Sequence, residues 1–323
     1  MSKKLLHLIA KKLKTPCTNI GLLDGKMGIA IFLYHYAQHI NCKQTEEFAD
    51  KLIDEIIVGI SKQSKPEYFS NLAGIGIGIE YLVQQKFICG ESNEILELFD
   101  KHIHNALSLC YNQKMITKDV TIYGKYYIAR LNNPVEINPS LEVIKNNLIK
   151  VLDLLSYYTY QDIFYTINFL PDVLSVDIEN KKAGCFMNYA VDRLETMVYE
   201  DVFFKKYPEN FNPLIAAFLL LRASSKIGND NFKVSALYFL DNYELGFRQY
   251  LSNEHSVKWA FLYYFLSKAL DSDIYLGFAN QWFGKIITDS LNVDFENLIK
   301  TGMMLLSMDK IIDDKWLDWF SLN

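Results

Sequence analysis

The sequence predicts an all-α protein: an α/α toroid of seven helical hairpins that forms one domain over residues 1–323. Three observations lead to this expectation. Half of the residues are apolar and 14% are aromatic, whereas glycine and proline are scarce, at 15 and 7 residues. A short glycine motif followed by an apolar run recurs along the chain, and amphipathic segments lie between the copies. This pattern suits long packed helices better than a β sandwich, which needs many turns.

The glycine motif is clearest in its first three copies. They begin at Gly25, Gly74 and Gly124, so their starts lie 49 and 50 residues apart. Later copies are weaker and are spaced by about 43 residues, with starts near residues 169, 212, 256 and 299. Seven copies therefore cover the chain, and repeats of this length indicate stacked helical units.

Each repeat is long enough for two helices. The run after the glycine motif is apolar nearly all round, which predicts an inner helix buried on all sides. The segments between these runs, such as 46–60 and 94–109, are amphipathic and predict outer helices with one face in water. This alternation favours a closed barrel, and an open helical solenoid is the alternative. An inner helix is expected to begin close to each of seven residues: Gly28, Gly78, Gly124, Asp172, Pro213, Ser256 and Thr301.

Composition and charge limit the classes of function. Lys and Arg number 33 against 38 Asp and Glu, a net charge of -5, so the strongly basic footprint of a nucleic-acid-binding protein is missing. No segment approaches the roughly 18 apolar residues of a membrane span. Residues 1–14 resemble a short amphipathic helix more than a signal peptide. The five cysteines are scattered without a Cys-x-x-Cys pair, which predicts reduced thiols in a cytoplasmic protein.

Two segments carry a resemblance to a known family. The segments 21–30 (GLLDGKMGIA) and 72–78 (LAGIGIG) resemble the Gly-rich repeats of the lanthionine synthetase C-like proteins, in particular the shorter members of the Bacteroidetes type. The match is clear over about residues 19–131, and it implies a seven-fold α/α toroid. It also implies cyclisation of a dehydrated precursor peptide by a cysteine thiol. In active members a zinc ion held by two Cys and one His activates that thiol.

The zinc ligands that the resemblance implies are not matched in this chain. Asn168 stands where active members carry a histidine in the fourth repeat, and the matching part of the fifth repeat, 211–213, has no cysteine. In the sixth repeat Glu254 and His255 stand in place of a Cys-His pair. The resemblance therefore implies a protein without zinc or another cofactor, a non-catalytic accessory that binds a precursor or leader peptide or a modifying enzyme. The alternative is an active peptide cyclase with a rearranged site, whose candidate catalytic residues are Asn168, Asp172 and His255.

The glycine-motif ends of the inner helices are expected to meet at one mouth of the toroid. Polar residues near these ends are the candidate peptide-binding residues: Asp24, Lys26, Glu80, Arg130, Asn168, Asp172, Asn212, His255 and Lys258. Lys26 and Lys258, with Lys125 and Lys300, would form a basic rim suited to an acidic peptide, unless they are only solvated helix ends. A further hypothesis pairs Asp24 and Asp172 as general acid and base, as in α/α-barrel glycosidases, although no local motif supports it.

Overall fold

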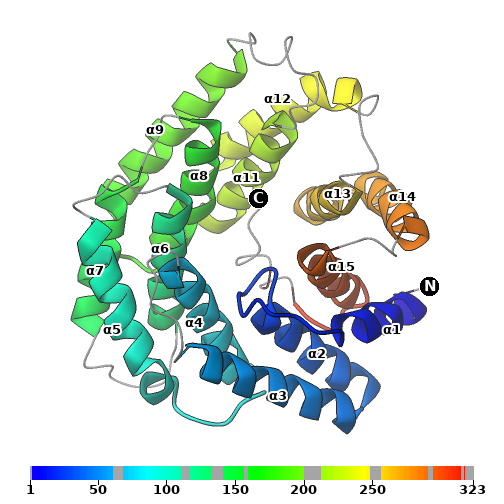
Figure 1. The fold of residues 1–323 in the computed structure, drawn as a ribbon. Helices are drawn as coiled ribbons and strands as arrows, with labels where there is room; N and C mark the ends of the chain where they lie inside the picture. The colour runs from blue at the N-terminus through cyan, green and yellow to red at the C-terminus, as the bar shows by residue number, and fades with distance from the viewer. Residues whose placement is uncertain are drawn as a thin grey trace. The chain divides into compact units, whose positions relative to one another are not determined.

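In the computed structural model the protein is all-α, as the sequence predicts (Figure 1). The structure describes residues 2–60, 68–110, 117–132, 141–155, 159–199, 212–247, 256–289, 294–313 and 316. Within these ranges the chain forms fourteen helices and no strand. None of these helices has both the length and the apolarity that crossing a membrane requires.

The helices fall into two groups that alternate along the chain. The motif helices contain or directly follow the glycine-motif segments and their weaker copies: α2 (Lys26–Ile40), α4 (Tyr68–Gln84), α6 (Thr117–Leu131), α8 (Tyr160–Ser175), α11 (Asn212–Ile227), α13 (Ser256–Leu270) and α15 (Phe295–Met308). The intervening helices are α3 (Lys43–Ile60), α5 (Ser92–Cys110), α7 (Leu141–Asp153), α9 (Asn180–Tyr199), α12 (Asp230–Phe247) and α14 (Asp273–Asp289). The amphipathic α1 (Ser2–Leu13) precedes them.

Burial differs between the two groups as the sequence predicts. In α2 every residue from Met27 to Ala37 is buried, because apolar side chains surround the helix. In α3 the buried residues lie on one face, whereas Ile57 and Val58 are 54% and 52% exposed. Motif helices are therefore enclosed by neighbours, and intervening helices face water on one side.

The chain divides into two compact units. Unit 1 comprises Met1–Lys114, Lys125–Asn147 and Asp289–Phe320, and unit 2 comprises Met115–Gly124, Leu148–Thr288 and Ser321–Asn323. In unit 1, α2 packs against α3 and α4 against α5, and α15 packs against both α1 and α2. In unit 2, α8 packs against α9 and α11 against α12, and α11 also contacts α8 and α13. The single domain over residues 1–323 stays a prediction.

Four of the expected helix starts are wrong. The helices at Pro213 and Ser256 begin as predicted, and α2 begins two residues before Gly28. However, Gly78 and Gly124 lie well inside α4 and α6, Thr301 lies inside α15, and Asp172 lies near the carboxyl end of α8. Gly78 and Gly124 therefore do not mark turns at helix ends. The residues that follow the motif also lie at different positions along their helices from one repeat to the next.

The glycines inside the helices have a packing role instead. A Cβ atom on Gly302 would overlap the ring of Phe32, one on Gly76 the ring of Tyr126, and one on Gly124 the ring of Phe169. In each case the aromatic ring belongs to the motif helix of the next repeat, counting α2 as next after α15. Glycine is needed at these positions because the ring occupies the space of its missing side chain.

Candidate functional site

Unit 1 contains a pocket of about 480 Å³ formed by α5, α6 and α7. Most of its polar wall comes from α5, where Asn93, Glu97, Asp100 and His104 follow one another at helical spacing and so share one face. This face runs along α5 for about 16 Å, since each residue advances a helix by about 1.5 Å. The full lining is Asn93, Glu94, Glu97, Asp100, Lys101, His104, Tyr127, Arg130, Val143, Ile144 and Asn147.

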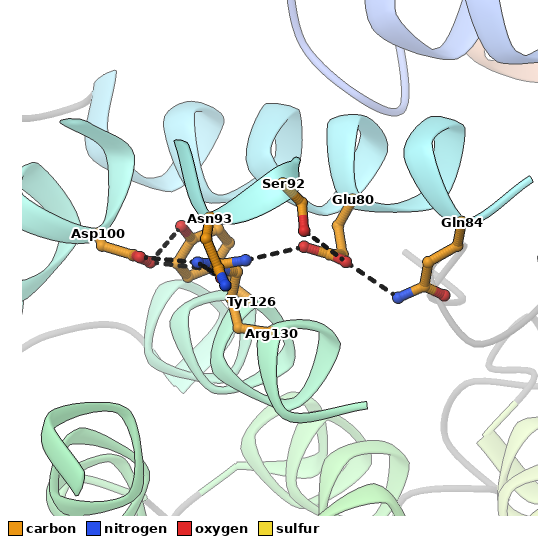
Figure 2. Close-up of polar contacts among 7 residues, drawn as sticks. All are labelled: Glu80, Gln84, Ser92, Asn93, Asp100, Tyr126 and Arg130. Atoms are coloured by element: carbon orange, nitrogen blue, oxygen red, sulfur yellow. Dashed lines mark hydrogen bonds and ion pairs between the residues drawn. The ribbon is translucent and has the colours of Figure 1, made fainter. Parts of the chain in front are cut away.

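At the pocket, Arg130 is held on two sides by carboxylates (Figure 2). Its Nη1 donates to Glu80 Oε2 at 3.0 Å, and its Nη2 donates to Asp100 Oδ2 at 3.0 Å. Nε donates to Asp100 Oδ1 at 3.3 Å, and Nη2 also donates to Asn93 Oδ1 at 2.9 Å. Four hydrogen bonds to three side chains therefore fix the guanidinium group in one orientation.

The two carboxylates beside Arg130 are themselves well satisfied. Asp100 Oδ1 also accepts a hydrogen bond of 2.6 Å from the Tyr126 hydroxyl, and Glu80 Oε1 accepts from Gln84 Nε2 at 3.1 Å. Burial lowers the pKa of Arg130, but hydrogen bonding to Asp100 and its charge outweigh this effect and raise the pKa above its ordinary value. Burial, reinforced by the charge of Asp100, raises the pKa of Tyr126 well above its ordinary value. Arg130 therefore stays charged and the Tyr126 hydroxyl keeps its proton around neutral pH.

His104 and Asn147 lie at the pocket away from this network. His104 Nδ1 lies 3.0 Å from Asn147 Oδ1. Because an amide oxygen only accepts, Nδ1 of His104 donates this hydrogen bond. Asn147 is 1% exposed, and among the described residues the bond to His104 is the only hydrogen bond of its side chain.

A second buried ion cluster lies in unit 2. Arg222 Nη2 donates to both carboxylate oxygens of Asp172, at 2.9 and 3.0 Å, and Nη1 donates to the Asn168 carbonyl at 2.7 Å. Lys226 Nζ lies 2.5 Å from Asp172 Oδ1. The pairs Glu80–Arg130 and Asp172–Arg222 each span 50 residues and join neighbouring motif helices, α4 to α6 and α8 to α11. The same kind of contact thus recurs in two repeats, which indicates a role in packing.

The structure brings some of the predicted site residues together within each unit. Glu80 pairs with Arg130, and Asp172 and Asn168 meet through Arg222. Asp24 is exposed in the turn before α2. Lys26 at the start of α2 is 2.5 Å from Glu55, and Lys300 is 2.6 Å from Glu296, so two lysines of the expected basic rim are in ion pairs. Lys258 is half-buried in α13, Lys125 is half-buried in α6, the side chain of Asn212 is not described, and His255 lies outside the described residues.

The donor set that matches the family's zinc ligands does not suit a thiolate-activating zinc site. Residue 212 is an asparagine and residue 254 a glutamate, so neither supplies the sulfur ligand that such a site uses. The described residues also contain no group of three or more His, Cys, Asp or Glu side chains arranged to hold a metal ion.

Sequence reasoning missed most of the pocket. Asn93, Glu97, Asp100, His104 and Asn147 all lie on intervening helices, where polar residues are expected to face water. Their only signal in the sequence is the polar side of an amphipathic helix, and most such sides are simply solvated.

No protein-family model matches the sequence. A search of curated proteins also finds no match.

Proposed function

We propose that this protein is a lanthionine synthetase C-like toroid of seven hairpins that lacks the zinc chemistry of active members. In this proposal it binds a peptide or a modifying enzyme as an accessory in the maturation of a ribosomally made peptide. The glycine repeats at 21–30 and 72–78 support the family, and the alternation of buried and half-buried helices supports the toroid. The packing of α15 against α2 and α1 supports closure, because a ring needs contact between its last and first members.

The main support for a binding role is an open pocket at which the buried charged groups, Glu80 and Arg130, are paired with each other. A catalytic acid or base must exchange a proton during turnover. Asp100 instead accepts hydrogen bonds from Arg130 and Tyr126, and the raised pKa of Tyr126 keeps its hydroxyl protonated. The pocket thus offers fixed polar groups and a fixed shape, which suit recognition better than proton transfer.

The candidate acid in unit 2 supports the same conclusion. Asp172 is 6% exposed and its carboxylate is paired with both Arg222 and Lys226. Two cations stabilise its ionised form, which disfavours a role as general acid. Asn168 keeps polar hydrogen-bonding groups, but it cannot titrate as a histidine would.

Peptide binding can be tested by selecting phage-displayed random peptides on the immobilised full-length protein. Selected peptides should bind saturably, and Val143→Trp should weaken them at least tenfold, because Val143 lines the pocket and is 48% exposed. The matched control is Val58→Trp on α3, which is 52% exposed and away from the lining, and it should bind as the unmodified protein does.

Four outcomes would contradict this proposal. If no peptide that binds saturably can be selected, the protein does not bind peptides as proposed. If the selected peptides bind Val143→Trp as tightly as the unmodified protein, they do not bind in the pocket. Stoichiometric zinc that is lost in His255→Ala, or thioether formation on a dehydrated peptide, would show that the protein is an active cyclase.

A further inference from the structure

We propose that the pocket between α5 and α7 selects a peptide segment that carries a lysine or arginine side chain. This inference rests on the peptide binding proposed above and names the chemistry that the pocket recognises. A cationic ligand differs from the acidic peptide that the sequence predicts, which a basic rim of lysines would attract.

The charges around the pocket favour a cation. The lining contributes three carboxylates, Glu94, Glu97 and Asp100, against the two cations Lys101 and Arg130. The charge of Arg130 is already offset by Glu80, whose side chain is 1% exposed and contacts it at 3.0 Å. The carboxylates of the lining therefore outnumber its lysine and arginine, and a positively charged side chain is attracted.

Two of these carboxylates are available to a ligand. Among the described residues, the side chains of Glu94 and Glu97 have no hydrogen bond or ion pair. Asp100 is held by Arg130 and Tyr126, yet its side chain is still 19% exposed. A lysine or arginine side chain entering the pocket would gain ion pairs without breaking the network around Arg130.

A second, independent feature points to a peptide group as part of the ligand. Asn147 is almost fully buried, lines the pocket and uses only its Oδ1 in the bond to His104, so its amide N–H donors have no acceptor among the described residues. In the tautomer whose proton is on Nδ1, His104 Nε2 is the complementary acceptor. A donor and an acceptor side by side match the C=O and N–H of a peptide backbone.

The apolar part of the wall fits the stem of the same side chain. Val143 and Ile144 on α7 lie at the pocket with the acidic residues of α5. Lysine and arginine bury their methylene stems along apolar surface while the charged group stays with polar partners.

Fluorescence anisotropy can test the selection with short probes of the form fluorescein-Gly-Ser-Ala-Xaa-Ala-Ser-Gly-amide. The probes with Xaa lysine or arginine should bind roughly three- to tenfold more tightly than the norleucine probe, the range expected for one or two partly exposed ion pairs. The glutamate probe should bind more weakly than norleucine. Added salt should reduce the lysine preference, because these carboxylates are screened.

The double variant Glu94→Gln/Glu97→Gln should remove most of the lysine preference and leave norleucine binding unchanged. The matched control is Glu47→Gln, an exposed residue on α3 away from the pocket, which should keep the preference. His104→Phe should weaken all probes alike, since it contacts the peptide group and not the cation.

The outcomes separate this inference from the proposal beneath it. The preference for a cationic side chain would be overturned if the norleucine or glutamate probe bound as tightly as the lysine probe or more tightly. It would also be overturned if no probe bound while phage-selected peptides still did. Both results would leave the proposed peptide binding intact. Persistence of the lysine preference in Glu94→Gln/Glu97→Gln would overturn the cationic selection by the pocket as well. Absence of binding by every peptide would remove both.

Discussion

Removing the Arg130 cation should destabilise the protein strongly. In Arg130→Met the methylene stem is largely kept, but Glu80 loses its only oppositely charged partner among the described residues. The side chain of Glu80 is 1% exposed, so water cannot replace the lost contact, whereas Asp100 at 19% can be partly rehydrated. Removing one member of a buried ion pair costs about 3–5 kcal/mol, because the other charge stays buried.

The measurement is urea unfolding followed by far-UV circular dichroism, with the free energy of unfolding extrapolated to water. The matched control is Lys145→Met, which removes a cation from an exposed pair with Glu142 whose side chains are 38% and 78% exposed. This control should lose less than about 1 kcal/mol. Adding Glu80→Leu to Arg130→Met should recover part of the loss, because the buried charge is then gone.

A loss of less than about 1 kcal/mol in Arg130→Met, the range of an exposed pair, would contradict a buried ion pair at this position. So would a lower stability of Glu80→Leu/Arg130→Met than of Arg130→Met alone. Either result would mean that Glu80 reaches water in solution.

Three further predictions concern packing, protonation and thiol reactivity. Gly124→Ala should lower the free energy of unfolding by about 1–3 kcal/mol because the added methyl group would overlap an aromatic ring. Gly184→Ala in α9, where the space around the glycine is open, should raise it by about 0.5–1 kcal/mol. Thermal unfolding would distinguish the two variants. Burial lowers the pKa of His35 to about 4, below its unfolded value, so the unfolded state binds the proton more readily and stability should fall as pH drops from about 6.5 to about 4. A His35→Gln variant should show a shallower fall in the same pH range, and an equal slope would contradict this assignment. Hydrogen bonds at the start of α3 lower the pKa of the Cys42 thiol, whereas burial raises the pKa of the Cys17 thiol. Iodoacetamide should therefore alkylate Cys42 before Cys17, which mass spectrometry would show.

Helix class and helix alternation could be predicted from the sequence because both depend on local periodicity. The order of residues along each segment predicts that α2 is apolar on all sides and that α3 is apolar on one face. The spacing of the glycine motif likewise predicted which segments are equivalent. It did not predict the helix ends, since Gly78 and Gly124 are required by contact with side chains of other helices and not by a turn.

The candidate site was mostly beyond the reach of sequence reasoning. Glu80, Arg130, Asn168 and Asp172 were predicted as polar residues near the mouth of the toroid, but the contacts that they make were not. Asp100 and Arg222 complete these pairs from 30 and 50 residues away in the sequence, and nothing in their local sequence marks them. A polar residue on an amphipathic helix has the same local pattern whether it meets water or a ligand.

The sequence by itself determined the all-α class, the repeat and the alternation of buried and half-buried helices, because hydrophobic periodicity acts within a single segment. The tertiary structure alone decided which charges pair, which glycines hold aromatic rings and where α5 and α7 leave a pocket. These features depend on which faces of distant helices meet, and that is set by the packing of the whole unit rather than by any one stretch of chain.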